Sequence, residues 1–362
     1  MSVSDGIIYL MVIFMVLGAL DRIFGNRFGL GAEFESGILA LGSLGLAMLG
    51  IICLAPVLAG LLRPVVVPVY RFFGADPAMF AGTILACDMG GGALAVELAQ
   101  SRDAAMLGGV IVGSMLGPTI VFTIPVALGI IPKEDHPYLA RGILAGIVTI
   151  PLGAFVGGLV AGYPVVMVLK NLIPILLIAL LIALGLWRAE NAMIKGFAVF
   201  GKLVVILITV GLAAAIVETL TGIVVIPGLA PLSAGYETIG AIAIVLAGAF
   251  PLVFVVTKLC KKPLMRLGRL LGMNEVAAAG LVATMANSIP MYGMLKDMDS
   301  RGKVLNVAFS VSAAFVFGDH LGFAAGFAPE MLPAMIVGKL VAGISAVALA
   351  LLFVRRDRHE SQ

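Results

Sequence analysis

Charged residues are scarce in this sequence. Asp, Glu, Lys and Arg make up 12% of its 362 residues, whereas hydrophobic residues make up 61%. Soluble domains carry about a quarter charged residues, so the composition excludes a soluble fold. Apolar stretches long enough to span a bilayer recur from one end of the chain to the other. The sequence therefore predicts an all-α polytopic membrane protein.

The motifs of common enzymes and metal sites are also missing. The sequence contains no HExxH, GxSxG or Walker A motif and no cluster of Cys and His residues. The three cysteines, Cys53, Cys87 and Cys260, lie in or beside apolar stretches, which indicates neither a disulfide framework nor a CxxC metal site. We therefore expect no enzymatic activity, no cofactor and no bound metal. The expected partners are membrane lipids and a small solute, not nucleic acid.

Hydropathy divides the chain into eleven apolar segments. They are predicted at 3–20, 37–62, 79–100, 104–131, 139–163, 165–187, 197–226, 237–258, 275–296, 303–328 and 333–354.

An internal repeat becomes visible when the sequence is compared with itself at an offset of about 198 positions. Similar residues then coincide throughout, for example Gly74 with Gly272, Asp76 with Asn274 and Asp88 with Asn287. We predict two structural repeats, one over 1–164 with a helical hairpin at 79–100 and one over 196–362 with a hairpin at 275–296. Residues 165–195 form the connecting helix and loop.

The basic residues indicate how the two repeats are oriented. The loops on both sides of segment 275–296 are rich in Lys and Arg, and so is the C-terminal tail RRDRHESQ. Cytoplasmic loops carry such an excess, so this segment should enter and leave on the cytoplasmic side as a re-entrant hairpin, with the C-terminus in the cytoplasm. The hairpin at 79–100 then opens to the outside. This interpretation has two inverted repeats with nine full spans and two hairpins, and the alternative has eleven spans and parallel halves.

Each hairpin breaks at polar residues in its middle. The first break contains Asp88 and the run Gly90-Gly91-Gly92, and the second contains Asn287, Ser288 and Pro290. Broken helices offer unpaired backbone groups near the membrane midplane, where transporters often bind their substrates. One carboxylate with neutral polar partners favours a small cation. Alternatively, Asp88 caps the helix that follows the glycines or is an ion-pair partner inside the helix bundle, and Asn287 only bonds to a neighbouring helix.

A second polar cluster, Asp319-His320, interrupts segment 303–328. Histidine titrates near neutral pH, so proton coupling through His320 is one interpretation. The other is a structural pair in which Asp319 binds His320 or Lys339. Several further residues are candidates for lining the same cavity. They are Thr119, Cys87, Glu97, Phe122 and Tyr292. An intramembrane hydrolase that uses Asp88 and Asp319 as paired carboxylates has no supporting motif.

The hairpins and the helix around His320 resemble a known family. The strings DPAMFAGTILACDMGGGALAVELA, AAAGLVATMANSIPMYGMLKDMDS and VFGDHLGFAA look like the ethanolamine-utilisation transporter family EutH, and the resemblance extends over nearly the whole chain. It implies a multi-pass protein of the bacterial inner membrane that admits ethanolamine for catabolism.

The chemistry of that solute agrees with the candidate residues. A protonated amine needs a negative or π-rich environment, which Asp88 supplies, and its hydroxyl group needs a partner such as Asn287, Ser288 or Thr119. The alternatives are a carrier of another small amine or zwitterion, an intramembrane enzyme and a cation channel. A homodimer would suit a moving hairpin region.

Overall fold

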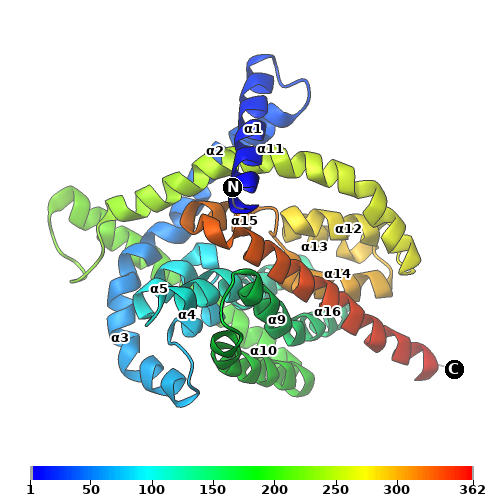
Figure 1. Ribbon diagram of the computed structural model, residues 1–362. Helices are drawn as coiled ribbons and strands as arrows, with labels where there is room; N and C mark the ends of the chain where they lie inside the picture. Colours follow the sequence, from blue (N-terminus) through cyan, green and yellow to red (C-terminus); the bar gives the residue numbers. More distant parts are fainter. Residues whose placement is uncertain (1–2, 361–362) are drawn as a thin grey trace.

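The computed structural model describes residues 3–360, without the side chains of residues 190, 260, 261 and 353–360. The tail arginines and part of the basic loop before segment 275–296 therefore lie outside the described side chains. Within the described range, all regular elements are helical (Figure 1). Seven helices are long and apolar enough to cross a membrane, and one bent pair brings the number to eight. This confirms the prediction of an all-α polytopic membrane protein.

The N-terminal region contains a helix far longer than a bilayer requires. Helix α1 (Val3–Ile23) is followed by α2 (Leu30–Leu44), which continues through a π-helical turn (Gly45–Leu49) into α3 (Gly50–Phe72). At 1.5 Å per residue the combined helix is about 65 Å long, roughly twice the thickness of the hydrocarbon core. The predicted segment 37–62 is therefore only the middle of this helix.

The first predicted hairpin consists of two short helices that turn back on each other. Helix α4 (Ala78–Ile84) and helix α5 (Gly91–Leu98) are joined by a 3₁₀ turn at Cys87–Met89. The Asp76 carboxylate accepts the backbone N–H groups of Ala78 at 2.9 Å and of Gln100 at 3.0 Å. One side chain thus ties the beginning of the hairpin to its end.

The next part of the chain is a bent helix followed by a straight one. Helices α6 (Arg102–Met106), α7 (Leu116–Pro118) and α8 (Ile124–Ile130) are linked by 3₁₀ and π-helical turns. Between its two limbs, 102–114 and 116–130, this region is bent by 41°. A 3₁₀ turn then leads into α9 (His136–Val160).

Two long helices follow in the middle of the chain. Helix α10 (Val165–Thr221) is interrupted at Ala189, whose backbone angles are not helical (φ −141°, ψ 46°). Its two parts, 165–189 and 191–221, each have the length and hydropathy of a membrane span. Helix α11 (Leu232–Leu270) follows and extends well beyond the predicted segment 237–258.

The second predicted hairpin is closed in a manner similar to the first. Helix α12 (Glu275–Ala286) and helix α13 (Ser288–Met294) meet at Asn287. At the open end, the Asn274 side-chain amide donates to the Asp297 carbonyl at 2.9 Å, and the Asn274 backbone N–H donates to the Asp299 carboxylate at 2.8 Å. Both ends of this segment therefore also lie together.

The last predicted pair of spans contains one broken helix. Helix α14 (Ser300–Ala313) and helix α15 (Asp319–Phe327) are separated by the non-helical residues 314–318, so segment 303–328 is not one continuous helix. Helix α16 (Leu332–Glu360) completes the chain.

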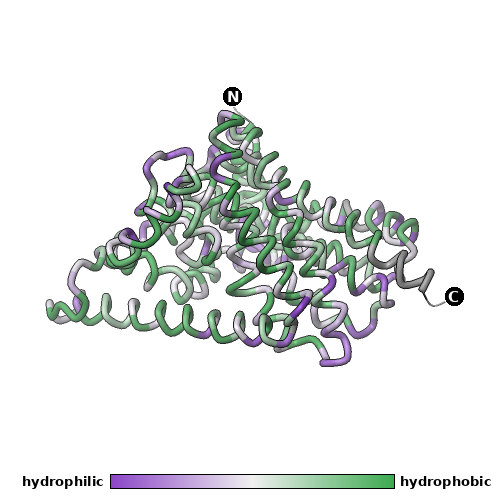
Figure 2. Tube along the Cα trace, turned by 90° about the horizontal axis from the view of Figure 1, so that it is seen from below, coloured by the Kyte–Doolittle hydropathy of each residue, from purple (hydrophilic) through white to green (hydrophobic). Residues whose placement is uncertain are grey.

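The two predicted hairpins lie on either side of the broken helix α15. Figure 1 shows the pairs α4–α5 and α12–α13 on opposite sides of the view, with α15 between them. Figure 2 shows mostly hydrophobic helices, with hydrophilic positions concentrated in loops and helix ends. Small residues let the helices approach closely, because a Cβ atom on Gly153 of α9 would lie 2.4 Å from the Gly338 carbonyl of α16.

Candidate functional site

A cavity of about 240 Å³ lies where the tip of the first hairpin meets α15. We call it the central cavity. Its wall combines two carboxylates and an imidazole with aromatic rings and a hydroxyl group. The residues that carry these groups are Ser43, Asp88, Phe122, Phe315, Asp319 and His320.

The break in the first hairpin places Asp88 in the cavity wall. Gly90 follows the turn with φ +89°, a conformation that L-residues disfavour, and a Cβ atom there would lie 2.0 Å from the Ile51 side chain. Glycine is therefore required at this position. Gly90, and not Asp88, is the N-cap residue of α5. The alternative in which Asp88 occupies that N-cap position is thus wrong.

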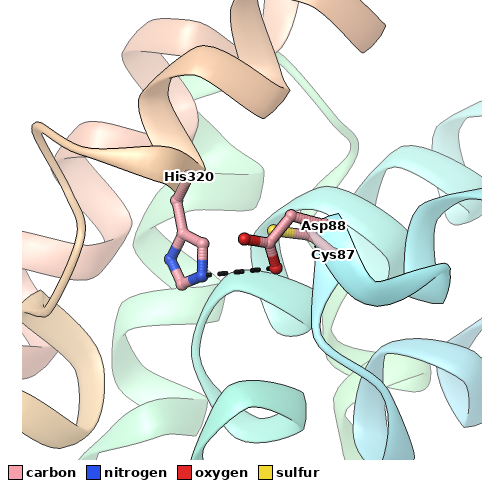
Figure 3. Close-up of side chains that lie close together, drawn as sticks. All are labelled: Cys87, Asp88 and His320. Atoms are coloured by element: carbon pink, nitrogen blue, oxygen red, sulfur yellow. Dashed lines mark ion pairs between the residues drawn. The ribbon is translucent and has the colours of Figure 1, made fainter. Parts of the chain in front are cut away.

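His320 lies between Asp88 and a buried lysine. Its Nε2 atom is 3.8 Å from Oδ1 of Asp88, and the ring points at that carboxylate in Figure 3. On the other side of the ring, the Lys339 ammonium donates to Nδ1 at 3.0 Å and also to the Ser114 carbonyl. Because Nδ1 accepts a hydrogen bond, the proton of the neutral ring is on Nε2 and faces Asp88.

Lys339 is a site residue that the sequence reasoning missed. It is 1% exposed and lies on α16, and the sequence analysis considered it only as a structural partner of Asp319. The signal was present, because an isolated lysine in the middle of an apolar helix is costly unless it has a partner. That partner is His320, so the predicted pairing of Asp319 with Lys339 is wrong.

Asp319 remains without such a partner. Among the described residues, no hydrogen bond or ion pair involves its carboxylate, although the side chain lines the central cavity. The cavity region thus contains the carboxylates of Asp88 and Asp319 but only one ammonium group, that of Lys339. With His320 neutral, one negative charge is left over, and a monovalent cation would balance it.

Aromatic rings strengthen this preference. The rings of Phe122 and Phe315 are in edge-to-face contact with centroids 5.6 Å apart, and the centroids of Phe315 and His320 are 5.3 Å apart. Ring faces attract ammonium groups. The arrangement can therefore bind a small organic cation through charge and through its π systems.

Cys87, Asp88 and His320 also have the donor atoms of a metal site. The nearest sulfur, oxygen and nitrogen atoms lie within 4.8 Å of one another. Such a mixed donor set suits a divalent transition metal. However, the Lys339 ammonium is bound to the same imidazole, and its charge opposes a second positive charge nearby. A monovalent cation fits this environment better.

Asn287 and Ser288 at the tip of the second hairpin lie elsewhere. The Asn287 side chain caps α13 by accepting the Ile289 N–H at 2.9 Å, and it lines a different cavity of about 410 Å³, which we call the second cavity. Ser288 is completely buried. Neither residue belongs to the central cavity.

Three other predicted residues also lie away from the central cavity. The Thr119 hydroxyl donates to the carbonyls of Met115 and Val311. The buried Tyr292 hydroxyl is 3.0 Å from the Ser310 hydroxyl oxygen. Glu97 lies near the end of α5, and the neighbouring Arg102 binds Glu330 at 2.8 Å instead. We infer that these three residues have a structural role and do not contact a solute in the central cavity.

The fold and the site define a polytopic helical membrane protein with a cavity between broken helices that two carboxyl groups line. The family model for the ethanolamine utilisation protein EutH matches residues 3–353. The chain belongs to this family, as the resemblance in its sequence suggested. No solved structure matches the chain.

Named relatives agree with the family assignment. The probable ethanolamine permease EutH of Listeria monocytogenes is 65% identical over 356 residues, which cover 98% of this chain and 95% of the relative. The protein of the same name from Salmonella typhimurium is 52% identical, with coverage of 99% and 97%. The uncharacterized protein YxeR of Bacillus subtilis is 54% identical, with coverage of 97% and 95%.

Proposed function

We propose that this protein is a permease that moves protonated ethanolamine across the bacterial inner membrane. The observation that carries the proposal is that the carboxyl groups of Asp88 and Asp319 line the central cavity while one buried lysine, Lys339, lies behind His320. In their charged forms these groups leave one negative charge, which a monovalent ammonium would balance. Relatives named probable ethanolamine permease support the choice of substrate. Their names also support transport over enzymatic conversion of the amine.

The substrate fits the cavity in one orientation. Its ammonium group lies against Asp88 and Asp319, next to the ring of Phe315, and its hydroxyl group accepts the Nε2–H of His320. The distance of 3.8 Å between Nε2 and the Asp88 carboxylate is too long for a direct hydrogen bond, so Nε2 is available to the substrate. His320 replaces Asn287, Ser288 and Thr119 as the hydroxyl partner, because these three do not line the central cavity.

We further propose that the chain consists of two inverted repeats, 1–164 and 196–362, joined by 165–195. The order of elements supports this division. Helix α1 corresponds to the second part of α10, and α2–α3 corresponds to α11. The two hairpins correspond to each other. The bent region 102–130 corresponds to α14–α15, and α9 corresponds to α16. Gly74 and Gly272, which precede the two hairpins, share a positive φ of 68° and 69°.

In this arrangement the two hairpins are re-entrant and open to opposite sides of the membrane. The bent region 102–130 and the broken α14–α15 each cross once, which makes nine spans, and the C-terminus is cytoplasmic. The basic residues around the second hairpin support this orientation.

Uptake of labelled ethanolamine into proteoliposomes tests the proposal. We expect saturable uptake above the leak of protein-free vesicles at the same pH, and strong reduction in a D88N variant. Uptake that is the same with and without an imposed proton gradient indicates a facilitator. Accumulation of ethanolamine only in the presence of the gradient indicates that transport is coupled to protons. The absence of protein-dependent uptake under both conditions would overturn the proposal. Stronger competition by another small amine would assign the cavity to that amine instead.

A further inference from the structure

We propose that the second cavity is a second binding site for the same ammonium substrate and that Asp319 passes the cation between the two cavities. The inference rests on the proposed function and extends it to a path. Asp319 lines both the central cavity and the second cavity. The first cavity contains the tip of the first hairpin through Asp88, and the second contains the tip of the second hairpin through Asn287.

The second cavity repeats the chemistry of the central one. Its wall contains the carboxylates of Glu33 and Asp319 and a single ammonium, that of Lys258. Two carboxylates face one lysine here as well, but Asp319 belongs to both cavities, so its charge is available to one cation at a time. The two cavities are therefore occupied in turn and not together. Three aromatic rings from α11 and the broken segment complete the wall, those of Phe250, Phe254 and Phe317.

Lys258 shows that this wall accepts a primary ammonium. Its Nζ atom lies 3.9 Å from the centroid of the Phe254 ring. A protonated ethanolamine carries the same group on a short chain. Because Lys258 occupies the face of Phe254, the rings of Phe250 and Phe317 are the ones that remain for the substrate. The Asn287 amide, whose oxygen caps α13, can donate its N–H groups to the substrate hydroxyl.

Helix α2 connects the two cavities. Glu33 and Ser36 line the second cavity, whereas Ser43 and Ala47, which lies in the π-helical turn that continues α2, line the central one. Their spacings of three, seven and four residues place them on one face of the helix. Ser36 and Ser43 are therefore separated by about 10 Å along the axis of α2. A polar stripe on this helix thus runs past both cavities.

The broken segment before α15 supplies a moving part. The backbone N–H of Phe315 donates to the Thr284 carbonyl at 3.2 Å, and that of Phe317 donates to the Met285 carbonyl at 2.9 Å. These bonds attach the segment to the tip of the second hairpin. A displacement of the hairpin would therefore carry Asp319 with it, and the cation would pass from Asp88 to Asp319 and then towards Glu33.

Cysteine protection in proteoliposomes separates the two sites. Single S36C and S43C variants, in a background with C260S, are treated with 2-aminoethyl methanethiosulfonate in the presence and absence of ethanolamine. Ser36 and Ser43 are exposed, whereas the native Cys53 and Cys87 are buried. At ethanolamine concentrations of ten times Kd, about ten proteins in eleven hold a cation. Because that cation is shared between the cavities, we expect both reactions to slow, each by about twofold if it divides equally. S233C, exposed at a different cavity, should react at an unchanged rate.

The D88N substitution then tests whether the second site is independent. We expect D88N to abolish protection of S43C while protection of S36C persists, and D319N to abolish both. Protection of S43C alone in the otherwise unchanged protein would overturn the second site and leave the proposed function intact. Loss of both protections in D88N would show that S36C only senses the central cavity, which also overturns the inference. Absence of protection at both positions would count against the proposed function itself.

Discussion

At the scale of single residues, the charges in the central cavity decide what it can bind. The carboxylates of Asp88 and Asp319 face the cavity, whereas the Lys339 ammonium is buried behind the imidazole of His320. The lysine offsets part of the negative charge without occupying the space in which the substrate lies. Two predictions follow from this separation of roles.

Asp88 should be essential for binding. D88N keeps the size of the side chain but removes the negative charge that balances the substrate. Removing one partner of a buried charge contact costs roughly 2–5 kcal/mol, so ethanolamine binding should weaken by about 30-fold or more. Labelled-ethanolamine binding to the purified protein measures the change. The matched control is E97Q, which alters a carboxylate outside the central cavity and should leave binding intact.

Lys339 should control release of the substrate. K339M leaves two carboxylates with no internal cation, so a bound ammonium is held more tightly and dissociates more slowly. We expect both KM and the maximal rate of uptake to fall, each by roughly tenfold, in contrast to the rise in KM expected for D88N. Concentration-dependent uptake into proteoliposomes separates the two parameters. A variant with normal KM and a normal maximal rate would show that Lys339 has only a structural role.

At the scale of elements, the tips of the two hairpins differ in how they are built. The first tip depends on a glycine in a left-handed conformation, whereas the second depends on Asn287, which caps the helix that follows. The first tip is consequently intolerant of side chains at one position.

G90A should disrupt the first tip. A left-handed conformation costs an L-residue roughly 1–2 kcal/mol, and the overlap of the new Cβ atom with Ile51 adds about 1–3 kcal/mol. We expect a lower thermal unfolding temperature and loss of uptake. The control is G293A in α13, where a Cβ atom meets no atom within 4 Å and φ is not positive. Equal effects of the two substitutions would contradict a specific requirement at Gly90.

At the scale of the whole molecule, the open ends of the two hairpins report the orientation of the repeats. Gln100 and Lys296 are both exposed, and each lies close to the end of its hairpin. In the inverted arrangement they face opposite sides of the membrane. In an arrangement of eleven spans with parallel halves they would face the same side.

Labelling from one side of the membrane distinguishes these arrangements. In a C260S background, a membrane-impermeant maleimide applied to intact spheroplasts should label Q100C and should label K296C only after the membrane is disrupted. Labelling of both cysteines in intact spheroplasts would contradict the inverted repeats. Disrupted membranes serve as the control that both positions are reactive.

The sequence by itself determined the class of the protein and the places where its helices break. Scarce charge and recurrent apolar runs predict that the chain lies in lipid. Gly90 and Asn287 determine the backbone conformation of the residues next to them. Neither signal depends on contacts between residues that are distant in the sequence. It also identified Asp88, Asp319 and His320 as unusual, because ionisable groups are costly within apolar helices. Their exposure to one cavity could not be read from the sequence.

Only the tertiary structure decided which of these groups meet. His320 lies beside Asp88 and Lys339, although the three residues belong to three separate helical regions. Thr119 and Tyr292, in contrast, use their hydroxyl groups to bind neighbouring helices. The separation of Asn287 from Asp88 into two cavities, with Asp319 in both, likewise depends on the packing of α2 and α15. Local patterns do not determine such contacts, because the register between helices distant in sequence is set by the shapes of their side chains when they pack.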